Sequence, residues 1–255
     1  MSEPWLLLGD GNSARAVILG PVSPSFDDGA FCSVLSRALV GSGYGVLLVD
    51  TPALVESLAS ARGLSGVVEG LARELGARAS RVSLLAGYAL GGTVAVALSR
   101  YLPQVPRLLS ISGPGFVDAA LRRGLVPLVS ALESGQLGDA LRLLAERVAP
   151  LGHAPRAHHL DTLGSESGLG ELAVRRRMLA GFRLLLELDV RAQAASYAGE
   201  LLGLVGELSQ LATTENQAFT PGPRRRLVRV PGAGMRVLRD APEFAMQAIE
   251  GWLKT

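Results

Sequence analysis

Short runs of consecutive apolar residues alternate with segments of helical periodicity through the first 112 residues of the chain. The expected strands are 5–9, 15–20, 45–50, 81–86 and 106–112, and the expected helices are 29–43, 64–76 and 90–102. Strands that are apolar throughout have to be covered on both faces. The alternation therefore predicts an α/β protein, with a mostly parallel sheet and helices on both of its faces.

The pattern changes after residue 112. Residues 137–149 and 175–189 have helical spacing, and no strand of similar quality occurs before residue 199. Strand-like runs then return at 200–206 and 225–230, followed by an amphipathic helix over 242–253. We therefore predict a core formed by residues 1–112 and 199–255, with a helical cap over 113–198.

Charge and cysteine content narrow the classes of partner. The net charge is +2, and the arginine triplets at 175–177 and 224–226 are interpreted as solvated faces, with binding of a phosphate or an acidic partner as the alternative. No arginine stripe alternates with aromatic residues, so nucleic acid is not an expected partner.

Cys32 is the only cysteine, which is typical of a reducing compartment. No secretory signal or long apolar run is evident, so we expect a cytoplasmic protein without a membrane span.

A glycine-flanked turn stands between an apolar run and a helix of small residues. In the stretch LLAGYALGG, residues 84–92, Gly87 and Gly91 lie two positions either side of Ala89. A sharp strand-to-helix turn needs positive φ at its central residue, and residues almost without side chains at those two flanking positions. The spacing predicts such a turn at Ala89.

Taken together, these segments resemble the α/β-hydrolase fold family. The resemblance includes the strand ending in Leu19-Gly20, the strand ending at Asp50, the turn over 87–92, the helical insertion, the strand before Glu207 and the closing segment PGAGMRVLRDAPEFAMQAIEGWL. It implies a catalytic pocket at the carboxyl ends of the strands. In this family an elbow serine, a histidine and an acid form the catalytic set, and backbone N–H groups hold the oxyanion.

This sequence departs from the family pattern at each catalytic position. Ala89 occupies the serine position, Met235 the histidine position, and Ser209 the common acid position, with Glu207 two residues away. Pro21 stands where one oxyanion N–H is expected, and proline has none to donate. The Leu90 N–H is expected to remain as the other donor.

Other candidate residues have less support. His158 and His159 with Asp161 suggest a metal site, but adjacent residues point apart and no further ligands complete a set. We therefore expect no metal and no cofactor, and we interpret His153, His158 and His159 as residues of a cap loop. Cys32 is interpreted as a small buried hydrophobe.

Two more features bear on a site. Ser110 and Ser112 are expected to satisfy nearby backbone groups. The segment GDGNSA, residues 9–14, begins like a dinucleotide fingerprint but leads into a strand, so we interpret it as a hairpin turn.

The favoured hypothesis is a catalytically inactive protein with an apolar pocket under a cap, which binds a small apolar molecule or a protein. The predicted ligand-binding residues are Gly20, Pro21, Tyr88, Ala89, Leu90 and Met235. One alternative is a lyase, isomerase or cyclase that uses Glu207, Ser209, Tyr88 or a cap histidine. The other is a hydrolase with displaced catalytic residues, since the fold alone does not decide function.

Overall fold

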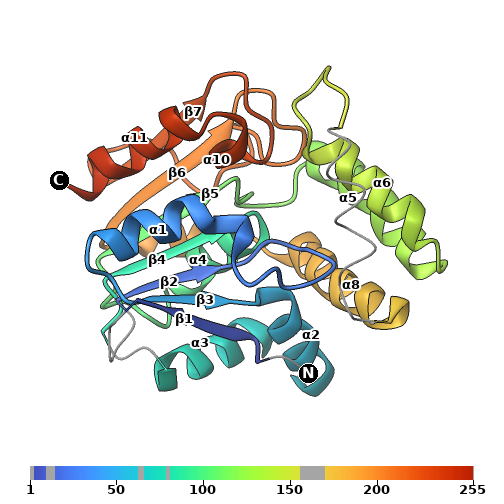
Figure 1. The fold of residues 1–255 in the computed structure, drawn as a ribbon, viewed down its shortest axis with the longest axis horizontal. Coiled ribbons are helices and arrows are strands. Elements are labelled where there is room, and N and C mark those ends of the chain that lie inside the picture. The colour runs from blue at the N-terminus through green and yellow to red at the C-terminus, as the bar shows by residue number, and fades with distance from the viewer. Residues whose placement is uncertain (1–2, 10–14, 63–65, 79–80, 156–169, 255) are drawn as a thin grey trace.

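The computed structural model describes residues 3–9, 15–62, 66–78, 81–155 and 170–254 (Figure 1). Its centre is a seven-stranded sheet with the order β1-β3-β2-β4-β5-β6-β7. The strands are β1 (Trp5–Leu8), β2 (Ala16–Leu19), β3 (Val46–Val49), β4 (Leu84–Tyr88), β5 (Arg107–Ile111), β6 (Glu200–Gly206) and β7 (Arg225–Val230). All neighbouring pairs from β3 to β7 are parallel, as the alternating pattern predicts.

The first strand departs from the prediction. β1 pairs antiparallel with β3, with Trp5 opposite Val49, and β2 lies on the other side of β3. The interpretation of residues 9–14 as a hairpin turn is therefore wrong, because the strands on either side of them are not neighbours. Residues 10–14 themselves lie outside the described residues. β2 is buried along its whole length, and its two flanks are occupied by β3 and β4.

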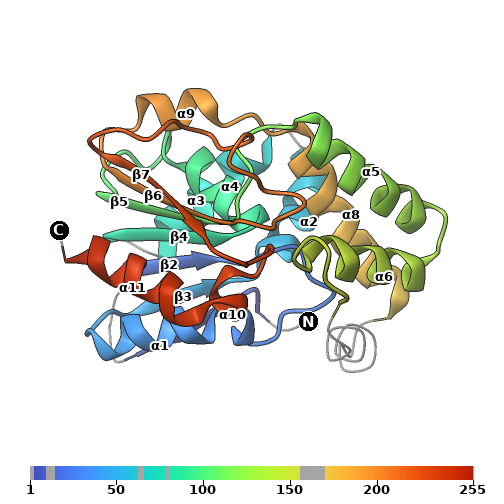
Figure 2. The ribbon, with the colours of Figure 1, turned by 90° about the horizontal axis from the view of Figure 1, so that it is seen from above.

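Helices cover both faces of the sheet (Figure 2). They are η1 (Ala30–Cys32), α1 (Ser33–Gly41), α2 (Thr51–Arg62), α3 (Val67–Arg78), α4 (Leu90–Leu98), α5 (Ala119–Glu133), α6 (Leu137–Val148), α8 (Glu171–Glu187), α9 (Arg191–Ser196), α10 (Val237–Asp240) and α11 (Pro242–Leu253). One apolar cluster joins α1, α10 and α11 to one face, and a second joins α2, α3, α4 and α9 to the other. The two-sided covering explains the continuous apolar strands.

The connection from β5 to β6 carries α5, α6 and α8, which extend past the ends of the central strands (Figure 1). Their apolar residues belong to the same cluster as strand residues such as Leu19 and Val49. The start and the end of this helical segment meet each other, because the Val190 N–H donates to the Gly115 carbonyl at 2.9 Å. α9 then packs against α4. The division into core and cap at residues 113 and 198 stays a prediction.

The described helices include none that is both long and apolar enough to cross a membrane.

Candidate active site

The turn between β4 and α4 has the strained geometry that its glycines predict. Ala89 has φ 48° and ψ −112°, a backbone conformation that side-chain-bearing residues rarely adopt. A Cβ added at Gly87 would lie 2.1 Å from the carbonyl carbon of Gly91. One added at Gly91 would lie 2.2 Å from the Leu19 carbonyl oxygen. The two glycines therefore allow the strand and the helix to approach each other, whatever residue occupies the turn.

The structure brings the predicted base and acid positions into contact. The Ser209 hydroxyl donates to the Met235 sulfur at 3.0 Å, and the Ala212 N–H approaches the same sulfur at 3.4 Å. Met235 is buried and lies against the same cavity as Ala89. The position assigned to a histidine thus borders the same cavity as the elbow, but the Met235 thioether accepts only weak hydrogen bonds and carries no proton.

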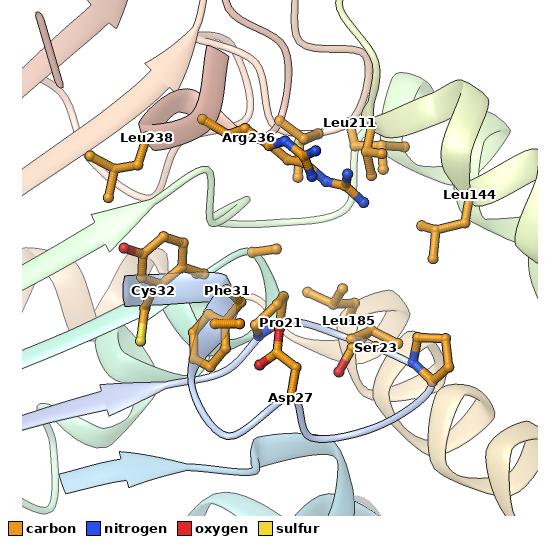
Figure 3. Close-up of a pocket in the computed structure, with 18 of the residues that line it drawn as sticks. Pro21, Ser23, Asp27, Phe31, Cys32, Leu144, Leu185, Leu211, Arg236 and Leu238 are labelled. Carbon is orange, nitrogen blue, oxygen red and sulfur yellow. The ribbon is translucent and has the colours of Figure 1, made fainter. Parts of the chain in front are cut away.

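A cavity of about 540 Å³ lies in front of the elbow (Figure 3). Its walls come from the loop after β2, from η1, from α5, α6 and α8, and from the segment around α10. Most of its lining is apolar, and the apolar residues from the β5–β6 connection and the following loop are Leu121, Leu125, Leu144, Val148, Phe182, Leu185 and Leu211. A cavity of this size and lining holds a small organic molecule.

Four of the six predicted ligand-binding residues line this cavity, namely Pro21, Tyr88, Ala89 and Met235. Gly20 and Leu90 are buried beside it and do not line it. Leu90 is the first residue of α4, so its N–H has no acceptor within the helix, as an oxyanion donor requires.

Other predicted catalytic candidates lie elsewhere. Glu207 is exposed, pairs with Arg229 at 3.0 Å and accepts a hydrogen bond from the Gly232 N–H. His153 is exposed and does not line the cavity. His158, His159 and Asp161 lie outside the described residues. Among the described groups that the alternative enzyme hypothesis names, Tyr88 lines the cavity, whereas Glu207, Ser209 and His153 do not.

Asp27 is a cavity residue that the sequence analysis misses. It lies in the loop after β2, and Figure 3 shows its carboxyl reaching into the cavity beside Pro21. The residue as a whole is exposed to solvent, but its carboxyl is partly buried, and this burial raises the pKa of the carboxyl. Hydrogen bonds from the backbone N–H groups of Phe31, Gly29 and Ala30 lower the pKa, but by less. The position of Asp27 in the sequence, in the segment that follows the expected strand 15–20, could have identified it as a candidate. Loops at the carboxyl ends of parallel strands form the binding sites of such folds.

Arg236 is a second residue that the sequence analysis misses. It follows Met235 directly and reaches into the cavity from the wall opposite Asp27 (Figure 3). Burial lowers the pKa of its guanidinium to about 10, and the neighbouring charge of Arg239 adds to this effect. No ion pair joins the Arg236 guanidinium to a carboxylate among the residues that the structure describes.

Comparisons with known proteins place these features on a known scaffold. An α/β hydrolase enzyme from a Medee basin deep-sea metagenome library has a TM-score of 0.74 at 14% identity, over 98% of this chain and 94% of that one. Bromoperoxidase from Bacillus anthracis has a TM-score of 0.72 at 14% identity, over 98% and 95% of the two chains. The enol-lactonase from Burkholderia xenovorans has a TM-score of 0.69 at 17% identity, over 96% and 94%.

The protein has the α/β-hydrolase fold. By sequence it is similar to the pimeloyl-(acyl-carrier protein) methyl ester esterase of Photobacterium profundum, with 33% identity over 130 residues. These residues are 49% of this chain and 51% of the esterase, so the chain matches about half the length of this curated relative. No family model matches the sequence.

The prediction of a catalytically inactive binding module is contradicted by these comparisons. The sequence relative is named as an esterase, and the proteins that share the α/β-hydrolase fold are named as a hydrolase, a bromoperoxidase and an enol-lactonase. The prediction equates the loss of the family's residues at the serine, histidine and acid positions with the absence of all activity. The cavity also contains Asp27, a titratable group outside the three positions considered. The comparisons favour the alternative of an enzyme whose catalytic residues are displaced.

Two further titratable groups border the cavity in their neutral forms. Burial raises the pKa of the Cys32 thiol to about 12, and its sulfur donates to the Gly29 carbonyl at 3.4 Å. Burial likewise raises the pKa of Tyr88, with the nearby Cys32 adding to the shift. The Tyr88 hydroxyl is buried and has no hydrogen-bond partner in the described structure. Cys32 is therefore a buried small residue as predicted, and it is not a thiolate nucleophile.

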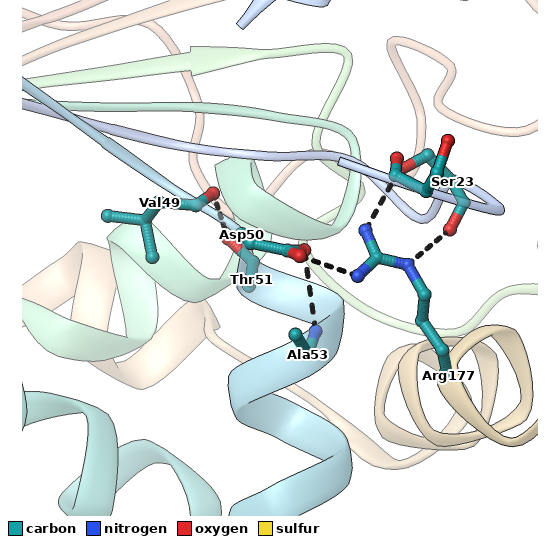
Figure 4. Close-up of polar contacts among 7 residues, drawn as sticks. Ser23, Val49, Asp50, Thr51, Ala53 and Arg177 are labelled. Carbon is teal, nitrogen blue, oxygen red and sulfur yellow. Dashed lines mark hydrogen bonds and ion pairs between the residues drawn. The ribbon is translucent and has the colours of Figure 1, made fainter. Parts of the chain in front are cut away.

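A buried ion pair holds the loop that carries Pro21 and Asp27 (Figure 4). Arg177 of α8 donates to the Asp50 carboxylate at 2.6 Å, and to the carbonyl and hydroxyl of Ser23 at 2.7 Å and 3.2 Å. Asp50, at the end of β3, also accepts from the Ala53 N–H. The interpretation of 175–177 as a solvated face is thus wrong for Arg177, which turns inward because the i, i+3 and i+4 neighbours of the helix face the core.

Proposed function

We propose that the protein is a hydrolase of small, largely apolar carboxylic esters or lactones, with catalytic groups displaced from the elbow. The observation that carries this proposal is the Asp27 carboxyl, which reaches into an apolar cavity in front of Ala89 and whose pKa burial raises. A partly desolvated carboxylate is a stronger general base than one in water. The esterase and lactonase named among the similar proteins support the choice of ester-like substrates.

The proposed reaction needs no nucleophilic side chain. The Asp27 carboxylate takes a proton from water, whose oxygen attacks the ester carbonyl and forms a tetrahedral oxyanion. The proposed donor to that oxyanion is the Leu90 N–H, which has no acceptor within α4. Leu90 itself does not line the cavity, so the substrate carbonyl has to reach past Ala89 to accept this hydrogen bond. When the intermediate collapses, the leaving alkoxide takes the proton back from Asp27, which regenerates the carboxylate.

Replacement of Asp27 tests the proposal directly. Wild-type protein is expected to hydrolyse p-nitrophenyl butyrate, and D27N is expected to lower kcat/KM by about 100- to 10,000-fold, the usual contribution of a general base. D28N is the matched control, because Asp28 is the exposed neighbour, does not line the cavity and has φ 49°, which asparagine tolerates. Wild-type protein without activity, or equal activity in D27N and D28N, would exclude this mechanism.

The pH dependence offers a second measurement. Only the ionised carboxylate accepts a proton, so kcat/KM is expected to rise with pH through the pKa of Asp27. Since burial raises that pKa above 3.8, the acidic limb should lie above the value of a solvated aspartate. A pH profile of kcat/KM from pH 4 to 8 measures the limb. A midpoint at or below that of a solvated aspartate would contradict the assignment.

Labelled water distinguishes hydrolysis from a rearrangement on the same scaffold. In H₂¹⁸O, the mechanism predicts one ¹⁸O atom in the carboxylic acid product and none in the alcohol, as mass spectrometry of the two products would show. A product of unchanged mass would instead indicate an isomerase or cyclase.

A further inference from the structure

The cation at the wall opposite Asp27 has no role in the hydrolysis proposed above. Arg236 precedes α10 and lines the cavity together with Arg239. Its guanidinium offers five N–H donors. No hydrogen bond from these donors reaches an acceptor in the part of the chain that the structure describes.

Nearby carboxylates are already engaged elsewhere. Asp240 accepts from the Gly234 N–H at 2.9 Å, and Glu207 pairs with Arg229 at 3.0 Å. Asp27, the acidic residue of the cavity lining, lies on the opposite wall and is not within ion-pair distance of Arg236 (Figure 3). Arg236 is partly buried, and the charge of Asp240 raises the pKa of its guanidinium. Burial and the charge of Arg239 lower that pKa by more, so a net cost of holding the cation in the cavity wall remains. An anion supplied by a ligand would remove it.

We propose that Arg236 is the anchor of a carboxylate-binding site, which takes small molecules with an apolar chain and one free carboxylate. A guanidinium fork matches a carboxylate with two parallel hydrogen bonds. The chain would then extend toward the apolar side chains of α5, α6 and α8, such as Leu125, Leu144 and Leu185. The inference rests on the proposed function, because it assigns the substrates of that hydrolase to monoesters of dicarboxylic acids and to lactones with a free carboxylate.

Binding measured without turnover tests the site. Octanoate and the ketone 2-nonanone have the same chain but differ in charge, and neither can be hydrolysed. Isothermal titration calorimetry is expected to give octanoate a dissociation constant about 10- to 100-fold lower. R236M is expected to remove that difference, and R236K to keep part of it. R226M, which changes an exposed arginine of β7 outside the cavity, should bind as wild type does.

Urea denaturation shows whether a loss of binding in R236M comes from the missing guanidinium or from an unfolded protein. R236M replaces a partly buried cation that forms no ion pair among the described residues with an apolar side chain of similar length. Its urea midpoint should therefore equal or exceed that of the wild type. Equal affinity of the wild type for octanoate and 2-nonanone would overturn the proposal, as would full octanoate binding by folded R236M. Inorganic phosphate is a third ligand, and binding of phosphate in preference to octanoate would also overturn it.

The outcomes separate this inference from the proposed function. D27N should keep its octanoate binding, since Asp27 repels rather than holds a carboxylate. Octanoate binding by a protein that hydrolyses no ester would therefore support the site and reject the hydrolase. Hydrolysis of p-nitrophenyl butyrate without a preference for octanoate would reject the site alone.

Discussion

At the scale of single residues, Ala89 shows that the backbone of the elbow does not depend on a serine. The positive φ at Ala89 follows from the close approach of Gly87 to Gly91 and of Gly91 to Leu19. A sequence motif predicts this geometry because the constraint is local. Asp27 and Arg236 were not predicted for the opposite reason. Asp27 belongs to an irregular loop and Arg236 follows a turn, and only the packing of segments distant in the sequence brings both residues to one cavity.

Restoring two side chains should create the nucleophile that the elbow lacks. A89S alone places a hydroxyl at the turn without a base, so a fluorophosphonate probe is expected to leave it largely unlabelled. A89S/M235H adds an imidazole on the same cavity wall, and labelling measured by intact mass should rise at least about tenfold. A89S/M235L is the control, because leucine keeps the apolar bulk without a base. Equal labelling of both double variants would mean that residue 235 does not face the elbow productively.

At the scale of elements, α8 is held against the sheet by the ion pair between Arg177 and Asp50 in addition to apolar contacts. The side chains of Arg177 and Asp50 are only 5% and 7% exposed, and the same guanidinium holds Ser23. This contact joins α8, the end of β3 and the loop of the cavity. Helical periodicity predicts α8, but it does not indicate which arginine of the triplet turns inward.

Removing this arginine should be costly. R177M leaves Asp50 buried without its partner, which is expected to lower the free energy of unfolding by about 3–5 kcal/mol, measured by urea denaturation. The neighbouring R176M breaks an ion pair with Glu56 whose arginine is 62% exposed, so it should cost at most about 1 kcal/mol. A similar loss in both variants would show that the Arg177 contact has no special weight.

At the scale of the whole molecule, the order of the strands along the chain was accessible from the sequence, and the lateral position of β1 was not. Alternating apolar runs predict a parallel sheet covered on both faces, because a strand that is buried on both faces is apolar along its whole length. Which edge β1 joins depends on the free flank of β3, which is a property of the assembled sheet. The helices α2, α5, α9 and α10 were also not anticipated, and of these α2 packs between α3 and α8.

The bond between Val190 and Gly115 has an evolutionary consequence. Beyond the carboxyl end of β5, it joins the two ends of the segment 115–190, which carries α5, α6 and α8. Insertions, deletions or exchanges within it would alter the shape of the chamber above the elbow while the register of the strands beneath stays intact. Sequence changes confined to this one segment can therefore alter which ligands the cavity admits without changing the sheet.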